Sequence, residues 1–557
     1  MSLSTLVTGG NVPTKTAQVW WHVLRTSQID QKISQFRRDL SLPATTVPLT
    51  PSQVLWAMAM SASSTAGLLW DACAETLFVV ADDDQLAMLG LDQWVHHPDR
   101  EMLRPLRGER PHHTGNNNPG APDPFQQARN RVYQRFYRSL RWMLEPLDGS
   151  AFAGARRKRL TRAEVHARRA AHGDRGAQKE TLLATVCNDL IAKSVFAYPA
   201  GYGGSIAIDA TNIPSSRATG TYFEQPGLHG PDPDAHYWAL DRYHAKAGSY
   251  SYAATIVKSV PDPNQQGLFL GLGISWSKPT GGDSDNGIGA IQHAKTSGAI
   301  SDPDTGTRKT KATRYVIVDD GFAHKLDFKP RSKEEGYEVV HMPRKADVNS
   351  ITDLGSGVVL FHGTPFCPGT HALIDTYRRH VEQGAPRTKI EEIHEKLVPL
   401  RMRRRGLPQP SKDGETHDVV FYCPATRRYV TCPLGPPRPE GAEDDDERRN
   451  RPAMPNPPAK PGPPVCEQDS MQFKLTRRDY KAWQPEMTHA PRHTELYSHR
   501  NTDEAFHGYM KRDDFAGLRE HRHQTVTSPA LALWTTLAVI DVNIALQANR
   551  GITAPPA

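Results

Sequence analysis

Two aspartates stand where strand-like runs of the sequence end, and carboxylates in such positions can do metal chemistry. Asp209 ends the alternating apolar run SIAIDAT, and Asp319 ends a second run, RYVIVDDGF, in which Gly321 permits a sharp turn. If the two strands are neighbours, both side chains can hold one divalent cation such as Mg²⁺, which prefers carboxylate oxygens. Taken singly, strand-end aspartates more commonly cap turns.

A third acidic residue, Glu504, lies in a segment that the sequence predicts to be helical from about 495 to 511. On one continuous helix, Arg500 is one turn before Glu504 and Lys511 is two turns after it, so the three side chains share a stripe. By itself this pattern also fits an exposed ion pair worth roughly 0.3 to 0.5 kcal/mol.

The spacing around Glu504 carries a resemblance to a known family. Tyr497, Arg500, Glu504 and Lys511 follow one another with two, three and six residues between them, which resembles the Tyr-Arg-Glu-Lys signature of bacterial DDE insertion-sequence transposases. The Asp209-Ala210-Thr211 block and the Asp-any-Gly-aromatic block at 319–322 also resemble that family. The resemblance covers about residues 200 to 550 and selects Asp319 rather than Asp320.

The resemblance implies a fold and a chemistry. It implies an RNase H-like α/β core, with the first aspartate on the first strand, the second after the fourth strand and the glutamate on a late helix. Asp209, Asp319 and Glu504 would hold two Mg²⁺ ions, for which Mn²⁺ can substitute, and these ions would assist water and then a 3′-hydroxyl in attacking phosphodiesters. Tyr497, Arg500 and Lys511 would hold DNA phosphates near the cleavage point.

The partners implied by the resemblance are double-stranded DNAs, namely the terminal repeats of a transposon and a target, with a protein dimer in the DNA complex. Two other functions stay open. One is an RNase H-like nuclease that cuts without strand transfer. The other is a domesticated or defective transposase that only binds DNA, an alternative that the basic tracts at 156–175 and 401–405 motivate.

The texture of the sequence predicts three regions. Residues 1–180 read as a helical DNA-binding domain with a basic linker, and residues 181–345 with 490–557 read as a mixed sheet flanked by helices. Residues 346–489 read as a β-rich insertion before the last catalytic helix. In that insertion HDVVFYCPATRRYVTCPLG resembles a hairpin, and the Pro-rich and acidic stretch near 441–464 is predicted to be a disordered loop.

Basic residues gather between 156 and 175, where the DNA-binding prediction rests on Arg156, Arg157, Lys158 and Arg159. Such a cluster can neutralise DNA phosphates without reading sequence. A solvated basic helix or linker is the alternative. A helix over about 124–147, rich in arginine and aromatic residues, is predicted to pack on one face and to meet phosphate with the other.

The composition of the chain indicates the cellular compartment in which the protein is expected. The 557 residues carry 68 Lys and Arg against 61 Asp and Glu, and the six cysteines are widely spaced, which favours a reducing compartment. The first residues lack the positive flank and apolar run of an export signal. Asp541 and Asn543 interrupt the C-terminal apolar stretch, so it is predicted to be a buried helix and not a membrane span. The expectation is a cytoplasmic, nucleoid-associated protein.

Weaker signals lie in the insertion, which contains Cys367, Cys423, Cys432 and Cys466. Four thiols in one region raise the possibility of structural zinc, but no close Cys-any-any-Cys pair is present, so buried or surface thiols remain the alternative. Trp483 is a candidate for holding a flipped base, against the commoner packing role. The His112-His113 and His521-Arg522-His523 clusters read as solvent or DNA-facing side chains.

Overall fold

The chain forms an α/β protein that divides into two compact units. Unit 1 comprises Met1–Gly204, Ile208–Arg308 and Thr502–Ala557, and unit 2 comprises Ser205–Ala207 and Lys309–Asn501. The computed structural model describes residues 14–62, 69–104, 123–152, 160–198, 202–215, 234–239, 248–261, 269–277, 283–300, 313–344, 347–406, 408–412, 415–435, 451–512, 518 and 527–554.

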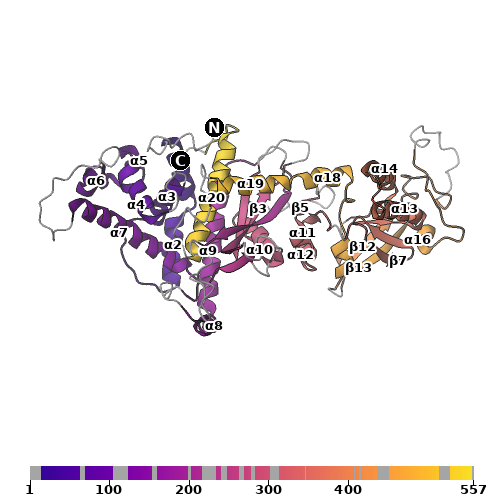
Figure 1. The fold of residues 1–557 in the computed structure, drawn as a ribbon, viewed down its shortest axis with the longest axis horizontal. Coiled ribbons are helices and arrows are strands. Elements are labelled where there is room, and N and C mark those ends of the chain that lie inside the picture. Colours follow the sequence, from indigo (N-terminus) through magenta and orange to yellow (C-terminus); the bar gives the residue numbers. More distant parts are fainter. Residues whose placement is uncertain are drawn as a thin grey trace. The chain divides into compact units, whose positions relative to one another are not determined.

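Unit 1 begins with helices, as the sequence predicts (Figure 1). One helix, α3, is buried along its whole length, which its apolar sequence PSQVLWAMAMSA requires. The helices and short helical turns up to the first strand are α1 (Thr14–Thr26), α2 (Ile29–Asp39), α3 (Pro51–Ala62), α4 (Trp70–Glu75), η2 (Thr76–Val80), α5 (Asp83–Met88), η3 (Asp92–Trp94), α6 (Pro98–Leu103), α7 (Pro124–Leu144), η5 (Glu145–Leu147), α8 (Arg162–Ala170) and α9 (Asp174–Lys193).

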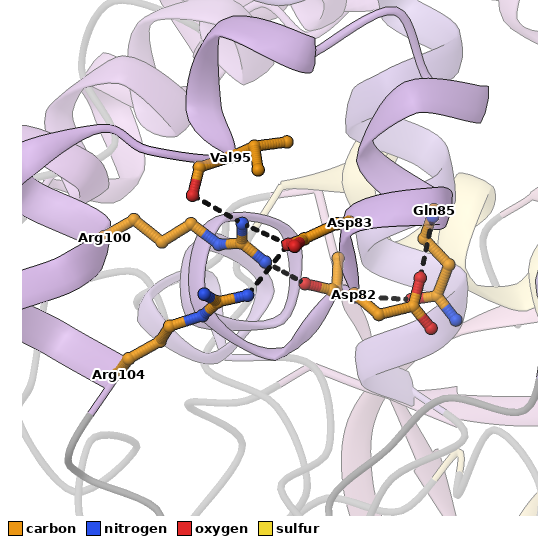
Figure 2. A network of polar contacts seen from close by, with 7 residues as sticks. Asp82, Asp83, Gln85, Val95, Arg100 and Arg104 are labelled. Atoms are coloured by element: carbon orange, nitrogen blue, oxygen red, sulfur yellow. Dashed lines mark hydrogen bonds and ion pairs between the residues drawn. The ribbon is translucent and has the colours of Figure 1, made fainter.

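A buried arginine joins the short helices α5 and α6 (Figure 2). The guanidinium of Arg100 donates to the Asp83 carboxylate at 2.8 Å, to the Val95 carbonyl at 3.1 Å and to the Ala81 carbonyl at 2.6 Å. Arg104 donates to the same carboxylate oxygen at 2.8 Å. The hydrogen bond from Arg100 lowers the pKa of Asp83. The two terminal nitrogens of this fully buried guanidinium thus have partners, which lowers the cost of burying its charge.

The sheet has the order β2-β3-β1-β5-β6, with β4 also paired to β3. Its strands are β1 (Ile206–Pro214), β2 (His236–Ala239), β3 (Gly248–Ser259), β4 (Gly271–Ser277), β5 (Tyr315–Val318) and β6 (Glu338–Val340). The β3–β4 pair is antiparallel and the β5–β6 pair is parallel. The five strands that the sequence predicts are confirmed, and β2 is an additional one. Strand β1 is shared, because residues 205–207 belong to unit 2 and the rest to unit 1.

Helices cover both faces of the sheet in unit 1. A Cβ on Gly271 would lie 2.4 Å from Val539 of α20 (Ser528–Ala548), and one on Gly273 would lie 2.7 Å from Ala294 of α10 (Asp283–Thr296). Both glycines are in β4, whose pairing with β3 shifts register at residues 257–258. The close approach of two helices therefore requires glycine at both positions.

The predicted buried C-terminal helix is confirmed as α20. It is the one helix of the described residues that is long and apolar enough to cross a membrane, and 94% of its apolar window is buried inside the protein. Because α20 is buried on all sides, apolar residues occupy its whole circumference. Its hydrophobic residues join one core with the N-terminal helices and with strands β3 and β4, so no break in packing marks the predicted boundary near residue 180.

Unit 2 combines helices with two further sheets. One has the order β10-β12-β11 with β13 on β12, and the other is β7-β8-β9. The elements are α11 (Asp320–Ala323), α12 (Phe328–Glu334), β7 (Ile351–Gly355), β8 (Val358–Phe361), β9 (Thr364–Phe366), η7 (Pro368–Thr370), α13 (His371–Glu382), α14 (Arg387–Leu397), η8 (Val398–Leu400), β10 (Arg403–Arg404), β11 (Gln409–Pro410), β12 (Thr416–Tyr422), α16 (Pro464–Glu467), β13 (Ser470–Thr476), α17 (Arg477–Ala482) and α18 (Pro491–Ser498).

Two local expectations in the insertion need correction. The predicted hairpin at 417–435 is not formed, because β12 ends before Cys423-Pro424 and pairs with β13, from Thr416↔Thr476 to Tyr422↔Ser470. Proline has no N–H for a ladder and ends the strand. In the stretch predicted to be disordered, residues 441–450 lie outside the described residues. Residues 451–464 are ordered by backbone hydrogen bonds, such as that from the Met454 N–H to the Thr431 carbonyl at 2.8 Å, and Met454 is buried.

Candidate active site

Asp209 lies on β1 in unit 1, with its side chain 14% exposed. One carboxylate oxygen accepts from the Ala210 N–H at 2.9 Å. The other is 3.6 Å from Nδ1 of His507. The expectation that Asp209 ends its strand is wrong, because β1 continues to Pro214 and Asp209 lies within it. Residues 206–208 are buried, so the core fixes the backbone that carries Asp209.

Helix α19 (Asn501–Lys511) presents a stripe of polar residues to Asp209. His507 and Lys511 are one turn apart on this helix, and burial lowers the pKa of Lys511 while Asp209 acts in the opposite direction. Glu504 is exposed and lies one turn before His507. Unit 1 therefore brings Asp209 and the helix of Glu504 and Lys511 together, although they are far apart in the sequence.

A buried ion pair fixes α19 on the sheet. Nζ of Lys258, in β3, is 2.7 Å from the carboxylate of Asp503, and both side chains are fully buried. The Lys258 ammonium also lies 5.7 Å from the ring centroid of Phe506. Asp503 directly precedes Glu504, so this pair sets the position from which Glu504 extends. Sequence reasoning missed Lys258 and His507, for which no local spacing signal exists.

Asp319 lies in unit 2, directly after β5, at the N-cap of α11. Its carboxylate accepts from the Phe322 N–H at 3.3 Å. A Cβ on Gly321 would lie 3.1 Å from the same carboxylate, which explains the glycine in this block. Its neighbour Asp320 forms an ion pair with Arg344. Asp319 thus has the turn-capping role that the sequence left open, and one of its oxygens is committed to it.

The predicted continuous helix through the signature is wrong. Helix α18 ends at Ser498 and α19 begins at Asn501, with a turn between them in which the Arg500 N–H donates to the Tyr497 carbonyl at 2.9 Å. Tyr497 lies in α18, stacked on His493 with ring centroids 5.9 Å apart. Arg500 and Glu504 therefore do not share one helical stripe, and Tyr497 and Arg500 belong to unit 2.

Only some of the N-terminal residues that the sequence predicts to contact DNA lie in the described part of the chain. Arg156, Arg157, Lys158 and Arg159 lie outside the described residues. On α7, Arg131 pairs with Asp99 at 2.5 Å, and Arg129 pairs with Glu75 at 3.0 Å. These two arginines of the predicted phosphate-facing stripe thus neutralise acids of the same unit, which weakens that prediction for them.

A basic groove of about 450 Å³ lies in unit 2, at the tract that the sequence marks as basic. Its arginines are Arg401, Arg403 and Arg404, with Tyr429 beside them and Glu486 as the lining acid. Arg403 lies 5.1 Å from the ring centroid of Tyr429. Burial lowers the pKa of Arg401, with Arg403 adding to the effect.

Trp483 borders this groove but is only 4% exposed. It packs on Phe421 with ring centroids 5.6 Å apart, within the core of the insertion. A tryptophan buried in this way is a packing residue, the alternative that the sequence had favoured. In the described residues, no group of three or more His, Cys, Asp and Glu side chains is arranged to hold a metal ion, and the two-Mg²⁺ expectation stays a prediction.

Comparison with known proteins adds no relative. No family model matches the chain, and neither the curated proteins nor the solved structures give a significant match.

Proposed function

We propose that this protein is a metal-dependent DNA transposase with an RNase H-like core, which cleaves the ends of a transposon and joins them to target DNA. One observation carries the proposal: Asp209, within β1, lies against the helix that bears Glu504 and Lys511, two members of the Tyr-Arg-Glu-Lys spacing. The spacing of Tyr497, Arg500, Glu504 and Lys511 along the sequence does not by itself require their helix to lie against Asp209.

The element order supports an RNase H-like core. Asp209 is on the first strand and Glu504 is on a late helix. Asp319 follows β5. Strand β2 is short and pairs only with the first four residues of β3, and without it β5 is the fourth strand of the sheet in sequence order. This is the order that the family resemblance implies.

The donor set suits the expected ions. Asp209, Asp319 and Glu504 offer carboxylate oxygens, which hard divalent ions prefer. Two Mg²⁺ ions, when bound, would activate the attacking oxygen and stabilise the leaving oxygen of a phosphodiester. For Asp319 to act as a ligand, the carboxylate must keep one oxygen for Phe322 and offer the other to the metal, as a monodentate ligand can.

Other side chains of the site would position the DNA and the carboxylate. The Lys511 ammonium beside Asp209 would contact a phosphate as a point charge, and Arg500 would do so through its planar guanidinium. His507 would orient the Asp209 carboxylate by donating from Nδ1. The basic groove would contact the DNA backbone, because its arginines outnumber its lining acid.

The proposed setting follows from the reaction. Double-stranded DNA is both substrate and target, and a dimer would bring two transposon ends together. A cytoplasmic, nucleoid-associated enzyme would meet both DNAs.

The test uses the full chain and a plasmid that carries its gene with the flanking DNA. With Mg²⁺ or Mn²⁺ we expect nicks at the element ends and, with a second plasmid, joined products. Asp209→Ala, Asp319→Asn and Glu504→Gln should each lower cleavage by at least about 10²-fold, since each removes charge that stabilises the transition state, while binding of end DNA in a gel-shift assay is retained.

Asp320→Asn is the matched control for Asp319→Asn, because it neutralises the adjacent carboxylate that pairs with Arg344. It should leave cleavage within about threefold, since an exposed ion pair contributes little. Unchanged cutting by Asp209→Ala or Glu504→Gln would overturn the assignment. Cutting without joined products would identify a nuclease, and binding without cutting by the wild type would identify a DNA-binding protein.

A further inference from the structure

Four of the six cysteines of the chain line one small pocket in unit 2. We call it the four-cysteine pocket, and its thiols are those of Cys367, Cys423, Cys432 and Cys466. The other two cysteines, Cys73 and Cys187, are buried in unit 1. The four come from three segments, up to about a hundred residues apart in the sequence, so their convergence is a product of the tertiary fold.

The local structure around three of these cysteines repeats. Cys367, Cys423 and Cys432 are each followed by proline, and each stands directly before a turn or a short 3-10 helix. The Thr370 N–H donates to the Cys367 carbonyl at 3.1 Å, and the Gly435 N–H donates to the Cys432 carbonyl at 2.9 Å. Turns of this kind direct backbone N–H groups toward the sulfur and leave the thiol facing the pocket.

Backbone amides do reach two of the sulfurs. Burial raises the pKa of Cys423, and hydrogen bonds from the backbone of Ala425 and Thr426 oppose this rise. Burial raises the pKa of Cys367 to about 12, and a backbone hydrogen bond from Gly369 opposes it. Donors aimed at a sulfur favour the thiolate, whereas burial without a cation disfavours it.

The neighbours of the pocket leave little room for any larger ligand. A Cβ on Gly369 would lie 2.6 Å from Met454, and one on Gly462 would lie 3.0 Å from Cβ of Cys466. The cavity volume is about 10 Å³, which is the space of a single ion or water. All four cysteines are free thiols, so no disulfide accounts for their proximity.

We propose that the four-cysteine pocket binds one Zn²⁺ through its four thiolates as a structural site. Four sulfur ligands and tetrahedral geometry are the usual structural zinc arrangement. The thiols are not at ligand distances in the present arrangement, in which the Cys367 thiol lies 3.9 Å from the sulfur of Met454. Binding therefore requires small side-chain rotations, which the half-buried Cys423, Cys432 and Cys466 permit.

The zinc would fasten segments that have little regular structure of their own. The turn after β12, the short helix α16 and residues 451–464 all border the pocket. Side chains of the β12–β13 pair belong to the same hydrophobic core as the four cysteines. Coordination bonds between these segments would stabilise the insertion in the way that longer helices or strands do elsewhere. This inference does not depend on the proposed DNA chemistry.

The test measures metal on the full chain, purified without chelators from zinc-supplemented cells. Elemental analysis should find one zinc per chain. Cys423→Ser and Cys466→Ser should each lose it, whereas Cys423→His, which keeps a zinc ligand, should retain it. Cys187→Ala is the matched control, because it removes a buried thiol outside the pocket and should leave zinc at one per chain.

Two further readouts make the result decisive even if a variant folds poorly. Replacement of the metal by Co²⁺ in the wild type should give the absorption of thiolate-to-cobalt charge transfer. After chelation, the denatured chain should show six reactive thiols. Zinc well below one per chain in the wild type, iron in its place, or only four reactive thiols because of a disulfide would each overturn the proposal.

Discussion

At the scale of single residues, the candidate site depends on charged groups that the core holds in place. Asp209 faces His507 and Lys511, and the adjacent Asp503 is paired with Lys258 beneath the helix. Ion pairs between fully buried groups are costly to break, because either partner alone is a charge without solvent. The Lys258–Asp503 pair is therefore a sensitive point for both stability and the position of Glu504.

Lys258→Met and Asp503→Leu should each destabilise the protein by about 3 to 5 kcal/mol, because each leaves an uncompensated buried charge. The double variant should recover most of that loss, since two apolar side chains of similar size replace the pair. Urea denaturation of the four proteins of this cycle measures the coupling.

The exposed pair between Lys396 and Glu392 serves as the comparison for this cycle. Lys396→Ala should cost no more than about 0.5 kcal/mol, as exposed helical pairs do. Equal losses from Lys258→Met and Lys396→Ala would contradict the structural role given to the buried pair.

At the scale of elements, side-chain amides satisfy the backbone of β4 on the side away from β3. Asn543 of α20 accepts from the Gly271 N–H at 2.7 Å and donates to the Gly271 carbonyl at 2.8 Å. Asn188 of α9 makes the same pair of bonds to Ile274, at 2.8 and 2.9 Å. Two helices thus cover an edge that would otherwise expose a row of unpaired groups.

Asn543→Ala should destabilise the protein by about 2 to 4 kcal/mol, because the buried N–H and carbonyl of Gly271 both lose their partner. Thermal unfolding followed by circular dichroism measures the shift. Asn549→Ala, at the exposed end of the same helix, is the control and should change stability by less than about 0.5 kcal/mol. Unchanged stability of Asn543→Ala would show that the hydrogen bonds to Gly271 do not stabilise the edge of β4.

The basic groove is expected to contribute to DNA affinity. Arg403→Ala should weaken DNA binding to a similar degree for all sequences and reduce the slope of log affinity against log salt by about 1, since one phosphate contact is lost. Arg387→Ala is the control, because Arg387 is highly exposed and paired with Glu391 outside the groove. Fluorescence anisotropy over a salt series measures this slope. An unchanged slope for Arg403→Ala would contradict the DNA-binding role of the groove.

At the scale of the molecule, the stability of unit 2 should depend on pH through buried histidines. His362 and His493 are nearly or fully buried, and burial lowers the pKa of His362 to about 3 and that of His493 to about 4. The ring of His362 lies 5.4 Å from that of His394, whose pKa burial also lowers. Protonation of this cluster is disfavoured in the folded chain but not in the unfolded one.

Stability should therefore fall as pH drops from about 6.5, where unfolded histidine binds a proton, toward about 4. In this window the unfolded state binds more protons, so each such histidine contributes a slope of about 1.4 kcal/mol per pH unit. Urea midpoints measured between pH 7 and pH 4.5 give the slope.

His362→Leu should reduce that slope by the contribution of one histidine, while His166→Ala, at an exposed position of unit 1, should not. A flat profile in the wild type above pH 5 would contradict the assignment of these rings as neutral and buried.

The sequence alone determined the parts whose signals are local. Apolar alternation located β1, β3, β4, β5 and β6, with Asp319 directly after β5, whereas Asp209 lies within β1 and not at its end. An apolar run with two polar interruptions located α20 as a buried helix. These predictions succeeded because the spacing of apolar residues along a strand or helix shows which of its faces are buried.

Only the tertiary structure decided what depends on distant partners. The two-residue turn at 499–500 leaves the signature spacing intact and so is invisible to periodicity. The pairing of β12 with β13, the Lys258–Asp503 pair and the convergence of four cysteines each join residues separated by dozens to hundreds of positions. No local pattern encodes such encounters, because the free energy that selects them comes from packing the whole unit.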